Sequence, residues 1–373
     1  MPLSVFPHAA VYTGYFATLG VLLTFLPPFL ERRGLAGAQI GVVMSISSVM
    51  VVIAPLAWGY VADRTRRPLL MLRVAIAGAT VAMLGLAVAP DFVSLVLAML
   101  AYAAFASSVA SQTDAATLIA IRKVGARYGV VRLFGSIGFV LGSAGAGLAM
   151  DREVSSTVMF SAMGAGLVLA LVSSLLIRDA GDAPAPARLS DIARLASDRR
   201  LLVVFVACGL HWVSLAPYHA FFAVHVQDLG LAASVAGVGF AVGAASEVVF
   251  MAAAERWRRS PKDILTAAFA VTAVRWVVVA HATDGVALVA IQVLHGFSFG
   301  VFYVAAVRAV TECVPERLRA TGQGLFFSVV FGIGGGVGTL TTGLGYDRIS
   351  GSGVFLAAAV VSLLSVVVSR KID

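Results

Sequence analysis

The sequence predicts an all-α membrane protein whose twelve transmembrane helices form two pseudo-symmetric halves of six. Three observations lead to this fold class: an apolar composition, a series of long apolar runs, and motifs that occur once in each half of the chain. Hydrophobic residues make up 60% of the 373 residues, charged residues make up 12%, and the mean hydropathy is +0.96. A soluble domain carries about 25% charged residues. The composition therefore excludes a water-soluble enzyme and a disordered chain.

The apolar runs define the predicted elements in order along the chain. A helix needs about 20 apolar residues to cross a bilayer, and short polar segments separate the runs. The first run is long enough to be a span and lacks the basic start of a cleavable signal peptide. The spans are expected near residues 9–30, 39–61, 69–89, 92–120, 130–149, 155–177, 201–225, 233–254, 263–281, 285–309, 321–345 and 352–369.

The longest polar segment lies between the sixth and seventh runs. It contains Gly181, Pro184 and Pro186, followed by an amphipathic stretch at 192–195. This pattern predicts a cytoplasmic linker with a short helix on the membrane surface. The predicted units are an N-terminal six-helix half at 1–177, the linker at 178–200 and a C-terminal six-helix half at 201–373.

The two halves carry matching motifs at matching spans. An acid-Arg-x-Arg-Arg pattern follows the second run at 63–67 and the eighth run at 255–259. The fifth and eleventh runs are both rich in glycine, which allows close helix packing, and both end in an Asp-Arg pair, at 151–152 and 347–348. Parallel repeats of this kind are a transporter architecture, with the substrate site between the halves near the middle of the membrane.

The charge pattern predicts the orientation of the chain. Lys and Arg number 27 against 19 Asp and Glu, a formal net charge of +8. Most basic residues fall on the side that holds both termini, so by the positive-inside rule we expect both termini in the cytoplasm and the chain in a bacterial inner membrane. This explanation leaves no need for a nucleic-acid partner. Cys208 and Cys313 lie in or beside apolar runs, and no CxxC or HExxH spacing occurs, so we expect no disulfide framework, metal or organic cofactor.

Several motifs carry a resemblance to a known family. Residues 59–67 resemble the loop motif of the major facilitator superfamily, and residues 128–139, 246–248, 274–276 and 293–296 are similar to the phenylpropionate permease family and, more distantly, to lactose permease. The likeness covers nearly the whole chain. It implies the major facilitator fold and substrate uptake coupled to proton entry, with protons as the coupling ion.

The resemblance also implies roles for individual charged residues. Asp114 and Arg132 have the spacing of the acid–arginine pair that binds substrate in lactose permease, and Glu247, Arg275 and His295 match three of its charged or titratable residues on helices eight, nine and ten. Lactose permease has a proton-carrying glutamate one turn after that histidine, whereas Ser298 stands there in this chain and Gln292 replaces a lysine. The phenylpropionate permease pattern lacks that glutamate too, which favours this branch.

Charges inside a bilayer are costly when unpaired, so we expect Asp114 to pair with Arg132 and Glu247 to pair with Arg275. The planar fork of Arg275 matches a carboxylate, so it either binds an anionic substrate or only holds Glu247. Glu247 is the first candidate for the proton carrier and His295 the second, although His295 is also readable as a hydrogen-bonded interior residue; Asp114 is a third. Asp114 and Arg132 are expected either to contact substrate or to form a cytoplasmic gate.

Two further groups of residues are candidates for the site. His211 and Tyr218 on the seventh span and Tyr15 on the first are expected to line an aromatic pocket, although such patterns also arise from ordinary packing. In the loop motifs we expect a lock between the halves, with a purely topological role for the arginines as the alternative. The loop residues are Gly59, Asp63, Arg64, Glu255 and Arg256.

These observations predict a transporter rather than an enzyme. The leading hypothesis is proton-coupled uptake of a small organic molecule by alternating access, with an aromatic monocarboxylate such as a phenylpropionate as the best guess. A nucleoside or sugar symporter and a drug efflux pump of the same fold are the alternatives, since one fold supports many functions. An intramembrane enzyme is disfavoured because no nucleophile–base pair or metal cluster is visible. The expected partners are a small-molecule substrate and the lipid bilayer, and the chain is expected to be a monomer.

Overall fold

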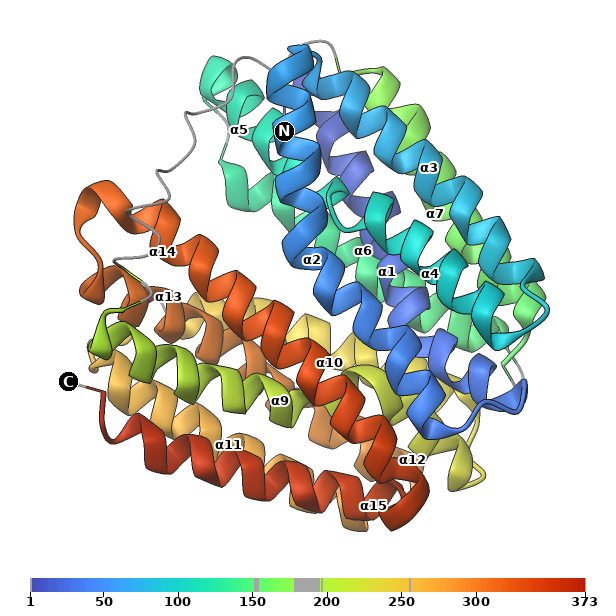
Figure 1. The fold of residues 1–373 in the computed structure, drawn as a ribbon, viewed down its shortest axis with the longest axis vertical. Helices are drawn as coiled ribbons and strands as arrows, with labels where there is room; N and C mark the ends of the chain where they lie inside the picture. Colours follow the sequence, from blue (N-terminus) through green and yellow to red (C-terminus); the bar gives the residue numbers. More distant parts are fainter. Residues whose placement is uncertain are drawn as a thin grey trace.

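The computed structural model describes residues 2–125, 127–150, 154–177, 195, 197–254 and 256–372. Within these ranges all regular elements are helices (Figure 1). The first half contains a short 3-10 turn, Leu3–Val5, and then α1 (Phe6–Arg32), α2 (Gly37–Thr65), α3 (Pro68–Val88), α4 (Phe92–Ala106), α5 (Val109–Val124), α6 (Tyr128–Ala149) and α7 (Ser156–Leu175). The predicted linker lies outside the described residues except for 195 and 197–200.

The second half has less regular helices. It contains α9 (Arg199–Asp228), α10 (Ala233–Ala254), α11 (Pro261–His281), α12 (Gly285–Ala290), the 3-10 turn η2 (Ile291–Leu294), the π-helix η3 (Gly296–Val301), α13 (Phe302–Cys313), the 3-10 turn η4 (Glu316–Leu318), α14 (Arg319–Phe326), the π-helix η5 (Phe327–Gly334) and α15 (Gly335–Ser369). The segment from α12 to α13 forms the predicted tenth span, and the segment from α14 into α15 forms the eleventh.

Within the described residues, eleven helical stretches are long and apolar enough to cross a membrane. The last of them, Thr321–Ser369, contains both the eleventh and the twelfth predicted spans. Ser350 interrupts it with a φ of 61° and a ψ of 173°, and the chain reverses direction there (Figure 1). This helical stretch therefore contains two membrane crossings, and the order and positions of the helices agree with the twelve predicted spans. The predicted fourth span is also divided, into α4 and α5, at residues 107–108.

The helices pack into two groups that meet along a few crossings. In the first half α1 lies against α6 and α7, and in the second half α9 and α11 pack on α15. Between the halves, α2 contacts α15, α6 contacts α10 and α1 contacts α9. At the α2–α15 crossing a Cβ on Gly343 would lie 2.4 Å from the carbonyl oxygen of Gly37, so glycine is required for the backbones to approach this closely.

The two groups of helices are not equally close along their length. Figure 1 shows them meeting near the α1–α2 turn and the reversal in α15, and diverging toward the ends at which both termini lie. We call the first the closed end and the second, which carries the loops at 64–67 and 256–259, the arginine-rich end. At the closed end the Asp347 carboxylate accepts hydrogen bonds from the backbone N–H groups of Gly37 (2.8 Å) and Ala38 (3.2 Å), so the second half caps a helix of the first.

Candidate functional site

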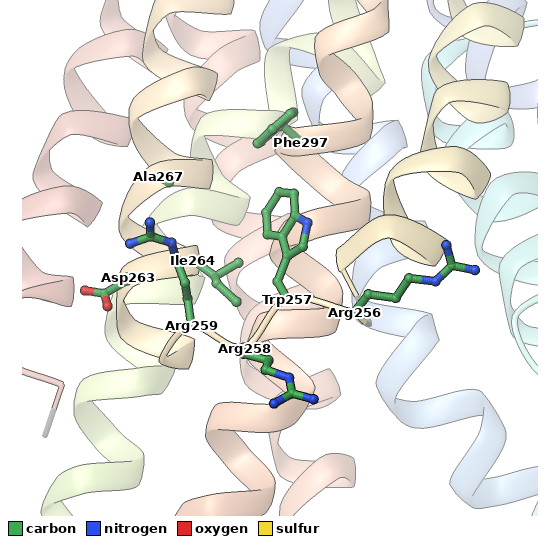
Figure 2. Close-up of a pocket in the computed structure, with 8 residues that line it drawn as sticks. All are labelled: Arg256, Trp257, Arg258, Arg259, Asp263, Ile264, Ala267 and Phe297. Atoms are coloured by element: carbon green, nitrogen blue, oxygen red, sulfur yellow. The ribbon is translucent and has the colours of Figure 1, made fainter.

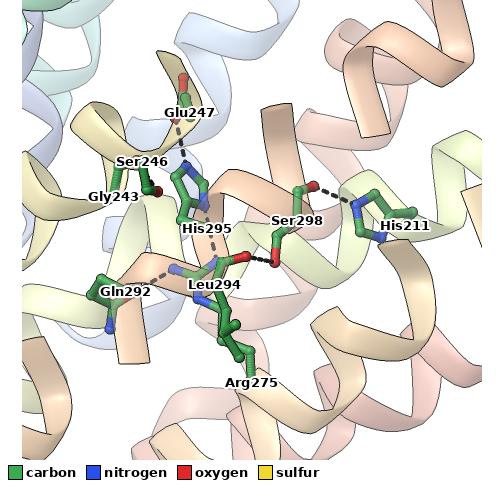
Figure 3. A network of polar contacts seen from close by, with 9 residues as sticks. All are labelled: His211, Gly243, Ser246, Glu247, Arg275, Gln292, Leu294, His295 and Ser298. Atoms are coloured by element: carbon green, nitrogen blue, oxygen red, sulfur yellow. Dashed lines mark hydrogen bonds and ion pairs between the residues drawn. The ribbon is translucent and has the colours of Figure 1, made fainter. Parts of the chain in front are cut away.

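A chain of three side chains lies inside the second half. Arg275 on α11 donates from Nη1 to Nδ1 of His295 (2.9 Å), and Nε2 of His295 lies 2.9 Å from Oε1 of Glu247 on α10 (Figure 3). A guanidinium has only donors, so Nδ1 of His295 is the acceptor. The neutral imidazole then carries its proton on Nε2 and donates it to Glu247.

Arg275 is held from several sides. Its side chain is fully buried, with Cζ 4.4 Å from the centre of the Tyr218 ring and 4.3 Å from that of Trp276. Its Nη2 donates a short hydrogen bond to Oε1 of Gln292. Two aromatic faces and two polar acceptors stabilise a cation that the bilayer would otherwise disfavour.

Glu247 and Arg275 were expected to pair directly. This expectation is wrong, because His295 lies between the two charges and contacts both. The two ends of the chain also differ in access: the Glu247 side chain is 24% exposed and His295 is 4% exposed, whereas Arg275 is 0% exposed. Glu247 is therefore the most exposed of the three side chains.

Irregular backbone brings His295 to Glu247. His295 stands between the 3-10 turn η2 and the π-helix η3, and π turns inside helices are frequent at functional sites. Glycines allow this stretch to lie close to α10: a Cβ on Gly296 would be 2.9 Å from the carbonyl oxygen of Ser246, and one on Gly300 would be 3.0 Å from that of Glu247. The glycines thus set the distance between the helices that carry the histidine and the glutamate.

In the first half, two tyrosines occupy the carboxylate of Asp114. Tyr12 donates a short hydrogen bond to Oδ1, and Tyr128 donates to the same oxygen at 2.8 Å. The expected Asp114–Arg132 ion pair is not among the contacts of the described residues. The Arg132 guanidinium instead lies over the rings of Phe16 (4.2 Å) and Tyr12 (5.4 Å). Phenolic donors replace the arginine because they reach the acid from α1 and from the start of α6.

Arg132 is the less committed of the two arginines. Within the described part of the chain its guanidinium has ring contacts but no hydrogen bond or ion pair, so its donors remain available to a ligand. It interacts electrostatically with Glu247 and with Tyr303 of the second half. Side chains from α6, α10 and α13 therefore lie within electrostatic range of one another across the two halves.

The predicted aromatic residues take different places. His211 is buried in the second half, where Nε2 lies 2.8 Å from the carbonyl oxygen of Ser298 and the rings of Phe269 and Phe302 are each 4.6 Å away. This position is in the helix core rather than beside Glu247. Tyr218 lies against His295 with the ring planes tilted and the ring centres 4.7 Å apart, and Tyr15 packs edge-on against Phe16 at 5.2 Å.

Sequence reasoning missed Tyr128 as a partner of Asp114 and Trp276 as a wall of the Arg275 site. Trp276 follows Arg275 directly in the chain, and this adjacency was the available signal. Tyr128 lies across a short turn from α5, but the competition between a phenol and an arginine for one carboxylate is not visible in spacing.

The loop motifs show no bridge between the halves in the described residues. Arg64 donates to the hydroxyl of Tyr60 on its own helix (3.0 Å), and no atom lies within 4 Å of a Cβ built on Gly59. Arg256 lines a surface cavity with its neighbours. Glu255 and the side chain of Asp63 lie outside the described residues, so the predicted lock stays a prediction.

Two groups of membrane-crossing helices, each with charged side chains inside it, are the arrangement of a membrane transporter of the major facilitator type. The chain belongs to the MFS_1 like family, which it matches over residues 8–357. It is 27% identical over 368 residues to the "Maltose permease" of Geobacillus stearothermophilus, covering 98% of this chain and 93% of that protein. It is also 27% identical over 380 residues to the "Probable 3-phenylpropionic acid transporter" of Escherichia coli, covering 97% and 96%.

A solved structure confirms the fold. The crystal structure of the nucleoside transporter NupG superposes with a TM-score of 0.86 at 17% identity, covering 100% of this chain and 99% of that one. The predicted superfamily, the helical membrane fold and the resemblance to a phenylpropionate transporter are thus confirmed. The family and these relatives are transporters rather than enzymes.

Proposed function

We propose that the protein is a proton-coupled symporter that takes up a small organic monocarboxylate by alternating access. The Arg275–His295–Glu247 chain carries this proposal, because only its acidic end is accessible. A proton that enters from the space between the halves meets Glu247 first. His295 and Arg275 then act as positioning residues that hold the carboxylate in one orientation.

Charge balance links the proton to the substrate. With Glu247 ionised and Arg275 charged, the chain of three residues is neutral. Protonation of Glu247 leaves one net positive charge beside Arg132, which favours an anion in the space between the halves. A carboxylate that enters with that proton moves no net charge, so the proposed cycle is electroneutral.

Arg132 is our choice for the group that binds the substrate carboxylate. Its guanidinium is unpaired within the described residues, whereas Arg275 already bonds Gln292 and His295. The ring of Phe16 lies against it at 4.2 Å, and Phe299 and Tyr303 stack 5.8 Å apart on the opposing half. These rings favour an aromatic acid, and the name of the Escherichia coli relative supports a phenylpropionate.

The remaining parts of the proposal follow from the sequence. We propose a bacterial inner-membrane location with both termini in the cytoplasm, so that the arginine-rich end faces inward. The two halves at 1–177 and 201–373 would rock about the site as units. The protein acts as a monomer in the bilayer, with protons as the coupling ion and no metal, organic cofactor or nucleic acid.

The test is uptake of radiolabelled 3-phenylpropionate into proteoliposomes over the first seconds, with protein-free liposomes to subtract passive entry of the free acid. An inward proton gradient of one pH unit supplies about 1.4 kcal/mol, enough for about tenfold accumulation. A membrane potential set by potassium and valinomycin is expected to leave the rate unchanged. Glu247→Gln is expected to abolish acceleration by the gradient while binding persists, whereas Glu316→Gln, in an exposed turn, retains it. Gradient-driven uptake that survives in Glu247→Gln would refute the assignment.

A neutral sugar or nucleoside is the second candidate, favoured by the relative named maltose permease. The side-chain carbonyl oxygens of Gln112 and Gln323 are buried without a partner among the described residues, and hydroxyl groups are suitable donors for them. A proton that enters with a neutral substrate carries charge. Uptake that rises with an inside-negative potential therefore identifies this alternative and excludes the electroneutral acid.

A further inference from the structure

We propose that the turn between α10 and α11 is a binding site for an anionic phospholipid, with its phosphate among arginines and an acyl chain along α11. A cavity of about 500 Å³ opens here at the arginine-rich end (Figure 2). This site is separate from the Arg275–His295–Glu247 cluster and does not depend on the proposed transport cycle. The cavity is lined by Arg256, Trp257, Arg258, Arg259, Asp263, Ile264, Ala267 and Phe297.

The charge on the rim is unbalanced. Arg256, Arg258 and Arg259 are exposed, and their side chains have no hydrogen bond or ion pair within the part of the chain that is described. Asp263 is the one acid among the described residues that line the cavity. Guanidinium groups bind phosphate oxygens in paired hydrogen bonds. The rim therefore suits a phosphodiester that carries a net negative charge.

The turn is held in place from a neighbouring helix. Arg308 on α13 donates to the backbone carbonyl oxygens of Trp257 and Arg259, each at 3.2 Å. Ser260 caps α11 by accepting the backbone N–H of Asp263 at 3.1 Å. The arginines thus extend from a backbone that is fixed to α11 and α13.

The inner wall of the cavity is apolar and continues into the membrane. Trp257 points toward Phe297 (Figure 2), their ring centres lie 6.0 Å apart, and Phe250 lies 4.8 Å beyond. On α11 an exposed stripe of small apolar residues runs away from the cavity, through Ala267, Ala270, Val274 and Val278. A soluble phosphate makes no use of such a stripe. A charged rim continuous with an apolar wall fits an amphiphile, and basic pockets between membrane helices suit anionic lipid headgroups.

The matching loop of the first half provides an internal comparison. Residues 64–67 repeat the arginine pattern, but Thr65 stands in the position that Trp257 occupies in the second half. Its hydroxyl donates to the backbone of its own helix at Val61 (2.8 Å). The two loops therefore share their arginines but differ in the aromatic wall.

The experiment is native mass spectrometry of the purified full-length protein with dioleoyl phosphatidylglycerol or dioleoyl phosphatidylcholine. The test variant is Arg258→Gln/Arg259→Gln, and the matched control is Arg66→Gln/Arg67→Gln. We expect phosphatidylglycerol to bind more tightly than phosphatidylcholine, and we expect about a fivefold loss of phosphatidylglycerol affinity for each arginine removed at the α10–α11 turn. The control pair is expected to change it less than twofold. Arg258→Lys/Arg259→Lys keeps the charge and is expected to retain most of the binding.

Three outcomes would overturn the proposal. Equal losses in the two glutamine pairs indicate diffuse attraction to a basic surface. Unchanged phosphatidylglycerol binding in Arg258→Gln/Arg259→Gln removes the arginines from the site. Displacement of the lipid by millimolar inorganic phosphate, together with unchanged lipid binding in Trp257→Ala, identifies a soluble phosphate as the occupant instead. A loss of dioleoyl lipid binding in Trp257→Ala supports the apolar wall.

Discussion

Asp347 is expected to keep the closed end of the protein shut, so its replacement should shift the equilibrium toward molecules in which this end is open. The carboxylate belongs to α15 of the second half and accepts two backbone N–H groups at the start of α2 in the first. These bonds exist only while the halves touch at this end. Removing them leaves the fold within each half intact but weakens the contact between the halves.

The size of the shift follows from the two bonds. A hydrogen bond to a charged group contributes about 1.5–3 kcal/mol, and a carboxylate at an exposed helix N-terminus adds about 0.3–1 kcal/mol. Water replaces part of this when the end opens, so we expect a net loss of about 2 kcal/mol for Asp347→Ala. That is about a 30-fold change in the ratio of closed to open molecules. Asp347→Asn keeps one acceptor and is expected to change the ratio about fivefold.

Distances between spin labels measure this equilibrium directly. Labels at Val88 and Leu356 place one probe in each half near the closed end, in a background with Cys208→Ala and Cys313→Ser. Double electron–electron resonance then gives the populations of molecules with short and with long distances between the labels. Asp284→Asn is the matched control, because Asp284 caps α12 within its own half by accepting the Ala287 N–H at 2.9 Å. Unchanged populations in Asp347→Ala, or an equal shift in Asp284→Asn, would refute the reasoning.

Three further predictions concern packing, accessibility and pH. Gly138→Ala is expected to lower the thermal midpoint of the purified protein, because its Cβ would lie 2.2 Å from a backbone carbonyl oxygen of α1, whereas Gly145→Ala meets nothing within 4 Å and is expected to be neutral or stabilising. A maleimide should label Cys313, which is partly exposed, and spare the buried Cys208 until the protein unfolds, as intact-mass measurements will report. The pKa of Asp91 is lowered mainly by the hydrogen bond that its carboxylate accepts from the backbone N–H of Ser94 at the start of α4. The contribution of this bond to stability is therefore present at neutral pH and is lost as the pH falls. The thermal midpoints of Asp91→Asn and the parent protein should converge in acid.

The sequence was sufficient to predict where the chain crosses the membrane. The predicted span at 39–61 lies within α2, Gly37–Thr65, and the predicted span at 233–254 coincides with α10. Burial in lipid requires a long apolar run and satisfied backbone groups, so composition alone determines these positions. The same argument does not reach the form of the backbone inside a span. The π-helix η3 after His295 results from packing of glycines against α10, and no local sequence pattern predicts it.

The residues of the Arg275–His295–Glu247 cluster were predicted correctly, but their hydrogen-bond partners were not. Glu247, His295 and Arg275 do form one cluster, as the resemblance implied, because buried charges at the same depth must find one another. Their order depends on which hydrogen-bonding group lies between the two charges, and His295 takes that place. In the first half, Tyr12 and Tyr128 bind the acid that was assigned to Arg132. Pairing by opposite sign ignores neutral donors that reach the same oxygen.

The arrangement of these charges bears on how the halves are coupled. In the proposed cycle the two halves rock as units, and Glu247, His295 and Arg275 all belong to the second half. The contacts among these three side chains therefore stay the same as the halves move. Arg132 belongs to the first half, so its distance from Glu247 does change. A ligand shifts a conformational equilibrium only through a difference in its affinity for the two states. In the proposed cycle, a proton on Glu247 and a substrate carboxylate between Glu247 and Arg132 would therefore act together on this separation, and through it on the motion of the halves.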